Sequence, residues 1–240
     1  MPPAATPDPA VLAVARQAAG MVTDGAKVGL GTGRAATAFV DELGARVRRG
    51  LRIVGAATSE ATARQAEALG IEMIDLDENV ILDLTVDGAD EVSPGLDLVK
   101  GWGGALVRER IVAAASRRQV ILVGPEKLVE RLGQRGRIPV EVIPLARGLV
   151  SRELRPLGLT PTVRLGTDGA SFRTDNGNFT LDCAPREALA DGAAARALEA
   201  SILAIPGVVD TGLFLGTAER VLIGHPDGRV EVRTREGGVS

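Results

Sequence analysis

The chain has 240 residues, a formal net charge of −3 and a hydrophobic fraction of 45%. This length allows one large domain, or one domain with a smaller companion, and a sizeable buried core. Basic and acidic residues are interspersed and aromatic residues make up only 2%, so the chain lacks the basic footprint and the stacking platforms of a nucleic-acid-binding protein. No nucleic-acid partner and no anionic membrane partner are therefore expected.

Residues 1–9 are rich in proline and alanine and lack the charged start and apolar core of a signal peptide. They are expected to form a disordered tail. No apolar run has the length of a membrane span, and a single cysteine excludes an internal disulfide and suits a reducing compartment. A cytoplasmic location is the expectation.

Cys183 and His225 are the only cysteine and the only histidine. No histidine stands near Cys183 in the sequence to activate its thiol, so a structural role is the favoured interpretation. His225 lies in a Gly-His-Pro-Asp-Gly sequence and is interpreted as an ordinary turn residue. Because one Cys and one His cannot supply the usual zinc ligand sets, no metal site is expected.

The first half of the chain alternates strand and helix signals, which predicts βαβ units and a mostly parallel sheet covered by helices. The expected elements are a strand near Val28, a helix from Ala35 to Val47, a strand at Leu51–Ala56, a helix at Ser59–Leu69, strands at Ile71–Ile74 and Ile81–Val86, a helix carrying Glu109, a strand at Val120–Val123 and a helix beginning near Glu126.

A glycine-rich turn, Gly31-Thr-Gly-Arg-Ala35, joins the first strand to the first of these helices. Such a turn aims backbone N–H groups and the positive end of a helix dipole at a bound anion, and phosphate is the obvious candidate. Gly31, Gly33 and Ala36 also satisfy a loose dinucleotide fingerprint, so NAD is an alternative. The next strand ends in Ala57-Thr58-Ser59 without an acidic residue for a ribose hydroxyl, which counts against NAD.

Polar side chains follow the next two strands. Ser59 is a candidate helix cap, and Thr58 and Ser59 can serve as caps only or also offer hydroxyls to a sugar phosphate. Asp87 ends an apolar run, so its side chain is expected at the carboxyl end of a strand, where open α/β sheets bind ligands.

Asp90, Lys100 and Glu109 complete a set of groups suited to moving protons on an anionic substrate. A lysine can offset negative charge that develops during reaction, and a partly buried glutamate can act as a base. Each residue also has a plain structural interpretation: Asp87 in a turn, Asp90 as a helix cap, Lys100 in a loop and Glu109 as a solvated helix charge.

From Gly133 the pattern changes to a loop, a strand (Val140–Ile143), a helix (Ala146–Leu157), two short strands flanking Thr174–Asn178 and a helix from about Arg186 to Leu203. The Asn176-Gly177 pair is a hairpin signal. This β-α-β-β-α order is that of a small ferredoxin-like α+β unit. Residues 208–232 read as short strands that can return to the main sheet.

The expected fold class is therefore α/β, a Rossmann-like mostly parallel sheet domain with an inserted smaller α+β domain of the ferredoxin-like kind. Residues 1–132 and 208–240 are expected to form the catalytic domain, and residues 133–207 the small domain, serving as a lid or for oligomerisation.

Beyond its first residues the chain resembles the A-type ribose-5-phosphate isomerases. The motifs that carry the resemblance are Gly29-Leu-Gly-Thr-Gly33, Thr58-Ser59, Val86-Asp-Gly-Ala-Asp-Glu91, Lys100-Gly, Gly104-Ala-Leu, Arg108-Glu109, Val140-Glu-Val-Ile-Pro144, Thr174-Asp-Asn-Gly-Asn178, Ile205-Pro-Gly-Val208 and Gly212-Leu-Phe214. The resemblance implies a cofactor-free aldose–ketose isomerase of the pentose phosphate pathway that interconverts ribose 5-phosphate and ribulose 5-phosphate, and that is usually a dimer or a tetramer.

The resemblance also implies roles for individual residues. Glu109 would be the proton acceptor, assisted by Asp87, Asp90 and Lys100. The expected substrate-binding residues are Thr32, Gly33, Arg34, Ala35, Thr58, Ser59, Asp87, Gly88, Ala89, Asp90, Lys100, Gly101, Trp102, Gly103 and Lys127.

Two positions depart from the family pattern. Arg34-Ala35 replaces a Ser-Thr pair, and Trp102 interrupts a turn of small residues. An arginine can bind phosphate bidentately, so phosphate binding can be rebuilt there. The alternatives that stay open are a sugar-phosphate deaminase, a CoA transferase with a nucleophilic glutamate, and a non-enzymatic sugar-phosphate sensor.

Overall fold

The computed structural model describes residues 8–235, which form two compact units. The first unit takes in the described residues up to Gly88, together with Val112–Glu126 and the residues from Glu219 on. The second unit consists of Ala89–Ile111 and Lys127–Ala218. Within residues 8–235 no helix combines the length and the apolar character needed to cross a membrane.

A seven-stranded sheet forms the centre of the first unit, with the order β14-β13-β7-β4-β1-β2-β3. All neighbouring pairs are parallel except β13 with β14, as expected for βαβ units closed by a terminal hairpin. Its strands are β1 (Lys27–Leu30), β2 (Val54–Ala57), β3 (Glu72–Met73), β4 (Leu84–Gly88), β7 (Gln119–Val123), β13 (Arg220–Gly224) and β14 (Val230–Thr234).

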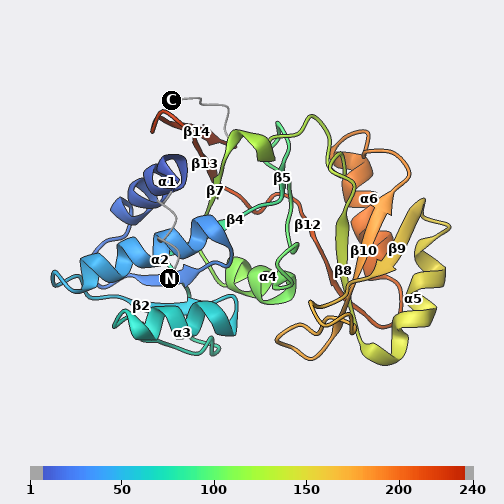
Figure 1. Ribbon diagram of the computed structural model, residues 1–240, viewed down its shortest axis with the longest axis horizontal. Coiled ribbons are helices and arrows are strands. Elements are labelled where there is room, and N and C mark those ends of the chain that lie inside the picture. Colours follow the sequence, from blue (N-terminus) through green and yellow to red (C-terminus); the bar gives the residue numbers. More distant parts are fainter. Residues whose placement is uncertain (1–7, 236–240) are drawn as a thin grey trace. The chain divides into compact units, whose positions relative to one another are not determined.

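Helices α1 (Pro9–Gly20), α2 (Arg34–Val47) and α3 (Glu60–Ala68) belong to the same unit (Figure 1). Buried apolar residues of α1 and α2 share one core with β1, β4 and β7, among them Val14, Phe39, Leu43, Leu30 and Val86. This core fixes the strands, so their carboxyl ends are presented together at one edge of the sheet.

Helix α1 was not among the expected elements, because its alanine-rich sequence follows directly on the proline-rich tail. Its start nevertheless has a clear local cause: the Asp8 carboxylate accepts the N–H of Ala10, and Pro9 takes the first turn, where no N–H is needed. The expected tail overlaps α1 at Pro9, and the rest of it, apart from Asp8, lies outside the described residues.

The second unit contains a four-stranded antiparallel sheet with the order β11-β8-β10-β9. Its elements follow one another as β8 (Ile138–Val142), α5 (Arg147–Leu154), β9 (Leu159–Val163), β10 (Phe179–Pro185), α6 (Gly192–Leu203) and β11 (Val208–Thr211). This βαββαβ arrangement confirms the expected ferredoxin-like unit. Together with the Rossmann-like sheet of the first unit it confirms the expected fold class.

A smaller three-stranded sheet in the second unit has the order β12-β6-β5. It is built from β5 (Glu91–Val92), β6 (Leu98–Val99) and β12 (Leu213–Phe214), and α4 (Leu106–Ala114) follows β6 in the chain. The short 3-10 helices are η1 (Pro125–Lys127) and η2 (Pro144–Ala146).

Three expected elements differ from the structure. The helix expected near Glu126 is only η1, and the helix expected from Arg186 begins at Gly192, where the Asp191 carboxylate caps it by accepting the N–H of Ala194. Between β9 and the Thr174–Asn178 turn there are only two isolated bridges, Leu165 with Ser171 and Arg173 with Phe179, because β10 pairs along its length with β8 and β9.

The segment after residue 207 divides between the sheets. Strands β13 and β14 join the large sheet as expected, but β11 pairs with β8 and completes the ferredoxin-like sheet. The compact units also have different limits from the expected domains, since residues 89–111 group with the small sheet. Compactness does not test which segments fold independently, so the expected domain boundaries stay a prediction.

Candidate active site

The carboxyl ends of β1, β2 and β4 bring three of the expected site segments together in the first unit. Gly31 follows β1 and its N–H bonds to the carbonyl of Val86, while the fully buried Asp87 carboxylate accepts the N–H groups of Thr32 (3.0 Å) and Gly88 (2.7 Å). A Cβ at Gly31 would lie 2.3 Å from Asp87 Oδ1, so only glycine permits this approach. Asp87 therefore fixes the start of the Gly31–Ala35 turn.

Four hydroxyl groups form a network beside this turn. Thr32 Oγ1 lies 2.7 Å from Thr58 Oγ1, 2.9 Å from Ser59 Oγ and 3.2 Å from Thr62 Oγ1. Thr62 Oγ1 donates to the carbonyl of Gly31, and Thr58 Oγ1 donates to the carbonyl of Leu30. Thr58, Ser59 and Thr62 are all buried. Ser59 also caps α3 by accepting the N–H of Thr62, which confirms its expected capping role.

Helix α2 begins at this turn. Its N-cap is Gly33, with φ +105°, and no side chain caps the helix start. Arg34 opens the helix with a largely exposed side chain (71%), and its Nη1 lies 3.6 Å from Asp8 Oδ2. The backbone N–H groups and the positive end of the helix dipole are available to an anion, with a guanidinium beside them.

In the second unit, the Lys100 ammonium lies 3.4 Å from Glu109 Oε1, with side-chain exposures of only 2% and 7%. Lys100 follows β6 and its N–H donates to the carbonyl of Gly212, while Glu109 lies in the first turn of α4. A Cβ at Gly212 would lie 2.4 Å from the Lys100 carbonyl oxygen, so a glycine is required for this backbone contact. A buried ion pair of this kind places a base and a positive charge together.

Arg110 is the neighbour of Glu109 on α4. Its guanidinium stacks over the Phe214 ring at 4.2 Å, bonds to Asp210 Oδ2 at 2.6 Å, and donates to the carbonyls of Thr211 and Leu213. Lys100 Nζ lies 5.6 Å from the same ring. The Phe214 ring thus lies beside two cationic side chains, those of Lys100 and Arg110. Burial raises the pKa of Asp210 despite its Arg110 partner.

Asp90 accepts the backbone N–H of Trp102 (2.9 Å). Burial raises the pKa of the Asp90 carboxyl, although this hydrogen bond and the charges of Lys100, Lys127 and Arg137 favour its ionised form. A carboxyl whose pKa is raised in this way holds its proton more readily, which suits a proton donor.

Trp102 lies against three cationic side chains. Its ring centroid is 4.4 Å from Arg137, 5.5 Å from Arg135 and 5.6 Å from Lys127, and its indole N–H donates to the carbonyl of Arg137. These contacts and the indole hydrogen bond fix the orientation of the ring. Gly101 is buried with φ +94°, and Gly103 is exposed.

Glu91 has a role that the sequence did not reveal. Its fully buried carboxylate accepts the N–H groups of Gly133 and Arg135, both at 2.6 Å, and so holds the loop that carries Arg135 and Arg137. Burial raises its pKa. The partners of Glu91 lie more than 40 residues away in the chain, so no local pattern predicts this role. The only hint in the sequence is a charged residue next to the apolar Val92.

The structure therefore brings the expected residues into two groups. Thr32, Thr58, Ser59 and Asp87 meet in the first unit, where Gly33, Arg34, Ala35 and Gly88 adjoin them in the chain. Asp90, Lys100, Trp102, Glu109 and Lys127 belong to the second unit, with Ala89, Gly101 and Gly103 adjoining in the chain. Whether each of them touches a substrate stays a prediction.

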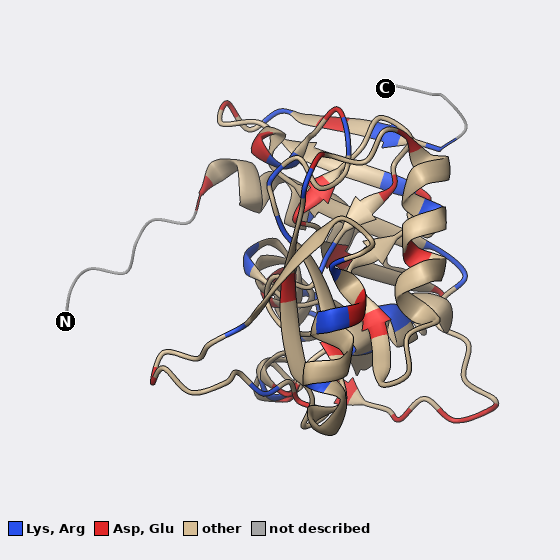
Figure 2. Cartoon of the chain, turned by 90° about the vertical axis from the view of Figure 1, so that its right-hand side faces the viewer, with Lys and Arg blue, Asp and Glu red and all other residues tan. Residues whose placement is uncertain are grey.

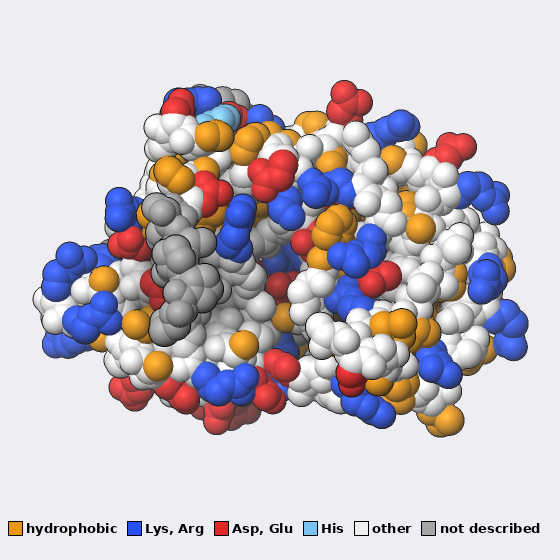
Figure 3. All heavy atoms as spheres, in the orientation of Figure 1, with side chains coloured by type: hydrophobic (Ala, Val, Ile, Leu, Met, Phe, Trp, Pro, Cys, Tyr) orange, Lys and Arg blue, Asp and Glu red, His pale blue; other side chains and the backbone are white. Residues whose placement is uncertain are grey.

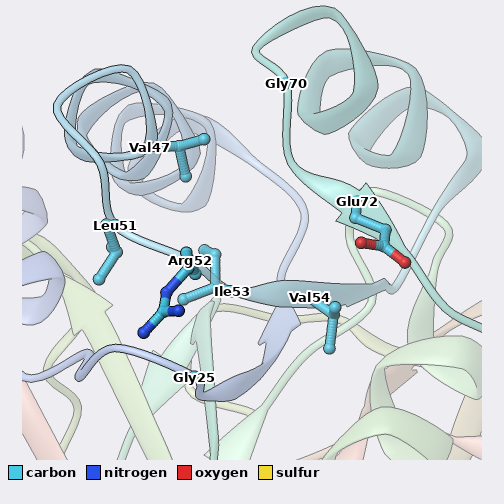
Figure 4. A pocket seen from close by; sticks show the side chains of 8 residues that line it. All are labelled: Gly25, Val47, Leu51, Arg52, Ile53, Val54, Gly70 and Glu72. Carbon is cyan, nitrogen blue, oxygen red and sulfur yellow. The ribbon is translucent and has the colours of Figure 1, made fainter.

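A pocket of about 360 Å³ lies elsewhere in the first unit (Figure 4). It is lined by the last residue of α2 and by residues at the amino ends of β1, β2 and β3: Val47, Gly25, Leu51, Arg52, Ile53, Val54, Gly70 and Glu72. It is thus at the opposite edge of the sheet from the hydroxyl network, and Arg52 beside it is paired with Asp24. We assign it no part in the chemistry.

The remaining candidate residues have structural surroundings. Cys183 is packed in the core of the small sheet, and burial raises the pKa of its thiol. His225 lies 3.3 Å from Glu231 across the β13–β14 hairpin. Across residues 8–235, no three His, Cys, Asp or Glu side chains are grouped so as to hold a metal ion. Acidic and basic residues are interspersed along the chain (Figure 2), and side chains of both signs are present on the face shown in Figure 3.

Comparison with known proteins places this geometry in a family. The family model described as ribose 5-phosphate isomerase A (phosphoriboisomerase A) matches residues 54–228. A ribose-5-phosphate isomerase A of Gloeobacter violaceus is 51% identical over 223 residues, covering 92% of this chain and 94% of the relative. One of Roseiflexus sp. is 48% identical over 213 residues, covering 88% and 90%.

Solved structures agree. The ribose 5-phosphate isomerase A of Methanocaldococcus jannaschii superposes with a TM-score of 0.88 at 39% identity, covering 95% of this chain and 100% of that one. A D-ribose-5-phosphate isomerase in complex with phospho-erythronic acid gives a TM-score of 0.89 at 33% identity, covering 95% and 99%. On this evidence the chain belongs to the ribose 5-phosphate isomerase A family.

Proposed function

We propose that this protein interconverts ribose 5-phosphate and ribulose 5-phosphate, an aldose–ketose isomerisation through an enediolate. Membership of the family supports the proposal, and one observation carries it: the buried Lys100 ammonium 3.4 Å from the Glu109 carboxylate. The reaction needs a base for the proton on C2 and positive charge beside the oxygen that becomes negative. Glu109 and Lys100 can supply both.

Glu109 takes the proton from C2 of the open-chain aldose and returns a proton to C1, which yields the ketose. Lys100 stabilises the enediolate oxygen, an interaction that strengthens as negative charge develops. Asp87 and Asp90 assist ring opening and the transfer of the second proton between the two oxygens. The raised pKa of Asp90 favours it as a donor.

The phosphate is proposed to bind at the start of α2, on the Gly31–Ala35 turn. The uncapped helix start and the glycine with φ +105° support this assignment, and Arg34, the first residue of the helix, adds positive charge. The Thr58 and Ser59 hydroxyls both bond to the Thr32 hydroxyl. Thr58 also donates to the Leu30 carbonyl, and Ser59 donates to the Thr62 hydroxyl. Their first role is then to shape this turn, and substrate contact would be additional.

The decisive experiment is incubation of the purified protein with ribose 5-phosphate and detection of the ketose. Protein treated with EDTA and desalted is expected to keep its full activity, because the proposed steps use only side chains. In deuterated water the product should gain deuterium at the transferred position, to the extent that protonated Glu109 exchanges before delivery. Absence of ketose with intact folded protein would reject the proposal.

The same samples test the alternatives. Release of ammonia from an amino sugar phosphate would favour a deaminase, and transfer of CoA through a glutamyl thioester would favour a CoA transferase. Binding of ribose 5-phosphate without turnover would favour a sensor. A requirement for restored metal or NAD would overturn the cofactor-free mechanism.

We also infer a homo-oligomer, a dimer or a tetramer, in the cytoplasm. Exposed apolar side chains stand where the β8 end, α5, α6 and β11 of the small sheet adjoin: Ile143, Leu145, Leu149, Leu203 and Val209. Leu145 is 97% exposed, and a cluster of exposed apolar side chains is a candidate association surface. Sedimentation of Leu145→Glu should show smaller particles than the native protein.

A further inference from the structure

The four-stranded sheet of the second unit has two different faces. Val140, Leu181 and Cys183 point to one face and form an apolar core with α5 and α6. The opposite face carries a row of polar side chains. Thr180 of β10 and Asp210 of β11 both stand opposite Glu141 of β8, and Arg164, which directly follows β9, donates its N–H to the Thr180 carbonyl.

This polar face contacts the segment that carries Lys100 and Glu109. Asp210 bonds to Arg110. Glu141 accepts from Thr174, Asn176 and Asn178 of one turn, and that turn accepts from Arg108 at Asn176 Oδ1 and at the Asp175 carbonyl. Both residues that flank Glu109 in sequence are therefore bonded to the small sheet or to the turn attached to it.

Arg164 makes the third connection. Its guanidinium pairs with both carboxylate oxygens of Asp182, and Nη1 donates to the carbonyls of Gly101 and Trp102, each at 3.0 Å. These carbonyls belong to the loop directly after Lys100. The side chain is 10% exposed, and its pairing with Asp182 leaves one edge of the planar group directed at the loop.

The backbone of this loop turns at two glycines, and a neighbouring side chain packs against the second of them. Gly101 and Gly104 both have positive φ, and a Cβ at Gly104 would lie 2.5 Å from the Phe172 ring. Phe172 is in the segment that follows Arg164, and its N–H donates to the Arg164 carbonyl. Arg164 thus bonds to the first part of the loop between Lys100 and α4, and Arg164 and Phe172 both lie beside Gly104 at its end.

We propose that Arg164 is a positioning residue for the Lys100–Gly104 loop and, through it, for the Lys100 ammonium beside Glu109. The proposal rests on the isomerase function proposed above. Arg164 does not touch the substrate and acts by fixing the loop carbonyls. Its loss displaces the Lys100 ammonium, whose position must be accurate for catalysis. A displacement of about 1 Å at a reacting group can lower the rate by about 10²-fold.

The test uses Arg164→Ala and Arg164→Lys in the full chain, with Arg152→Ala as the matched control. Arg152 is an exposed arginine of α5 that pairs with Glu153. Trp102 is the only tryptophan and the chain has no tyrosine, so its fluorescence reports on this loop directly and without substrate. Arg164→Ala should give red-shifted emission and a larger acrylamide quenching constant, with kcat lowered by about 10- to 100-fold and KM changed much less.

Arg164→Lys keeps the positive charge beside Asp182, but an ammonium cannot bond to Asp182 and to both loop carbonyls as the planar guanidinium does. Compared with Arg164→Ala, it should therefore recover part of the lost kcat and part of the native quenching behaviour. This variant also answers the question if Arg164→Ala does not fold. Native Trp102 quenching in either folded variant would overturn the proposal, and so would native kcat despite altered quenching. If the native protein has no isomerase activity, the proposed function fails, while the Trp102 measurement still decides whether Arg164 holds the loop.

Discussion

The hydroxyl network of the first unit and the Lys100–Glu109 pair of the second unit differ in how they are held. Thr32, Thr58 and Asp87 stand at the carboxyl ends of neighbouring parallel strands and bond to one another and to nearby backbone. Lys100 and Glu109 form an ion pair, and the residues that support their segment, Arg164 and Asp210 among them, bond to partners that lie 63 and 100 residues earlier in the chain. The first group is expected to matter most for stability and binding, and the second for the rate of the chemical step.

The largest expected effect is that of Glu109→Gln, which keeps the size of the side chain and removes the base. We expect kcat to fall by about 10²–10⁴-fold, the usual contribution of general base catalysis, with the fold intact by circular dichroism. Glu153→Gln, a change at an exposed carboxylate of α5, is the control. Near-native turnover by folded Glu109→Gln would move the base to Asp87 or Asp90.

Thr62→Val tests the other side of the comparison. Thr62 Oγ1 donates to the Gly31 carbonyl and joins the network around Thr32, so its loss leaves buried polar groups without partners. We expect the free energy of unfolding in urea to fall by about 1–3 kcal/mol, with a much smaller effect on kcat than Glu109→Gln has. Thr37→Val, at an exposed position of α2, should change stability by less than about 0.5 kcal/mol. A loss of kcat comparable with that of Glu109→Gln would contradict the division between the two groups.

Arg34→Ala should have a smaller effect that is confined to binding. A phosphate is held alike in the ground state and in the transition state, so KM for ribose 5-phosphate should rise while kcat stays nearly constant. Arg16→Ala, which removes an exposed arginine paired with Glu42, controls for the loss of surface charge. An unchanged KM would remove Arg34 from the phosphate site but leave the backbone donors of the turn in place.

The smallest expected effect is a pH dependence of stability from Asp90. Because burial raises its pKa in the folded protein above the ordinary value of 3.8, the folded state binds this proton more tightly than the unfolded state does. Its contribution to stability therefore falls as the pH rises from about that value through the folded pKa, and then levels off. The variant Asp90→Asn removes the titrating carboxyl, and its amide oxygen can still accept the Trp102 N–H.

Unfolding of the native protein and of Asp90→Asn in urea should be compared over a series of pH values. The free energy of unfolding of Asp90→Asn, relative to native, should increase through the same interval and stay constant above it. A difference that does not vary with pH, or that decreases, would show that burial does not control this carboxyl.

Local patterns were enough for much of the fold. The strand–glycine–helix passage around Gly31, the Ser59 cap and the buried run before Asp87 depend on residues adjacent in the chain, and the structure has these elements within a few residues of the expected places. Helix α1 was missed because alanine-rich sequence beside a proline-rich tail carries a weak apolar periodicity. The prediction of a helix beginning near Glu126 was wrong, because the chain there forms only the three-residue 3-10 helix η1 despite its helix-favouring composition.

The sequence by itself determined the fold class, because glycines, caps and strand ends act on residues adjacent in the chain. Residue types and the resemblance to a family also made Glu109, Lys100 and Asp87 candidates for the site. The tertiary structure decided that β11 completes the small sheet, that Glu91 holds the loop of Arg135, and that Arg164 bonds to the carbonyls after Lys100. These contacts join residues tens of positions apart. Their partners are chosen by strand register and burial, which no local pattern in the chain encodes.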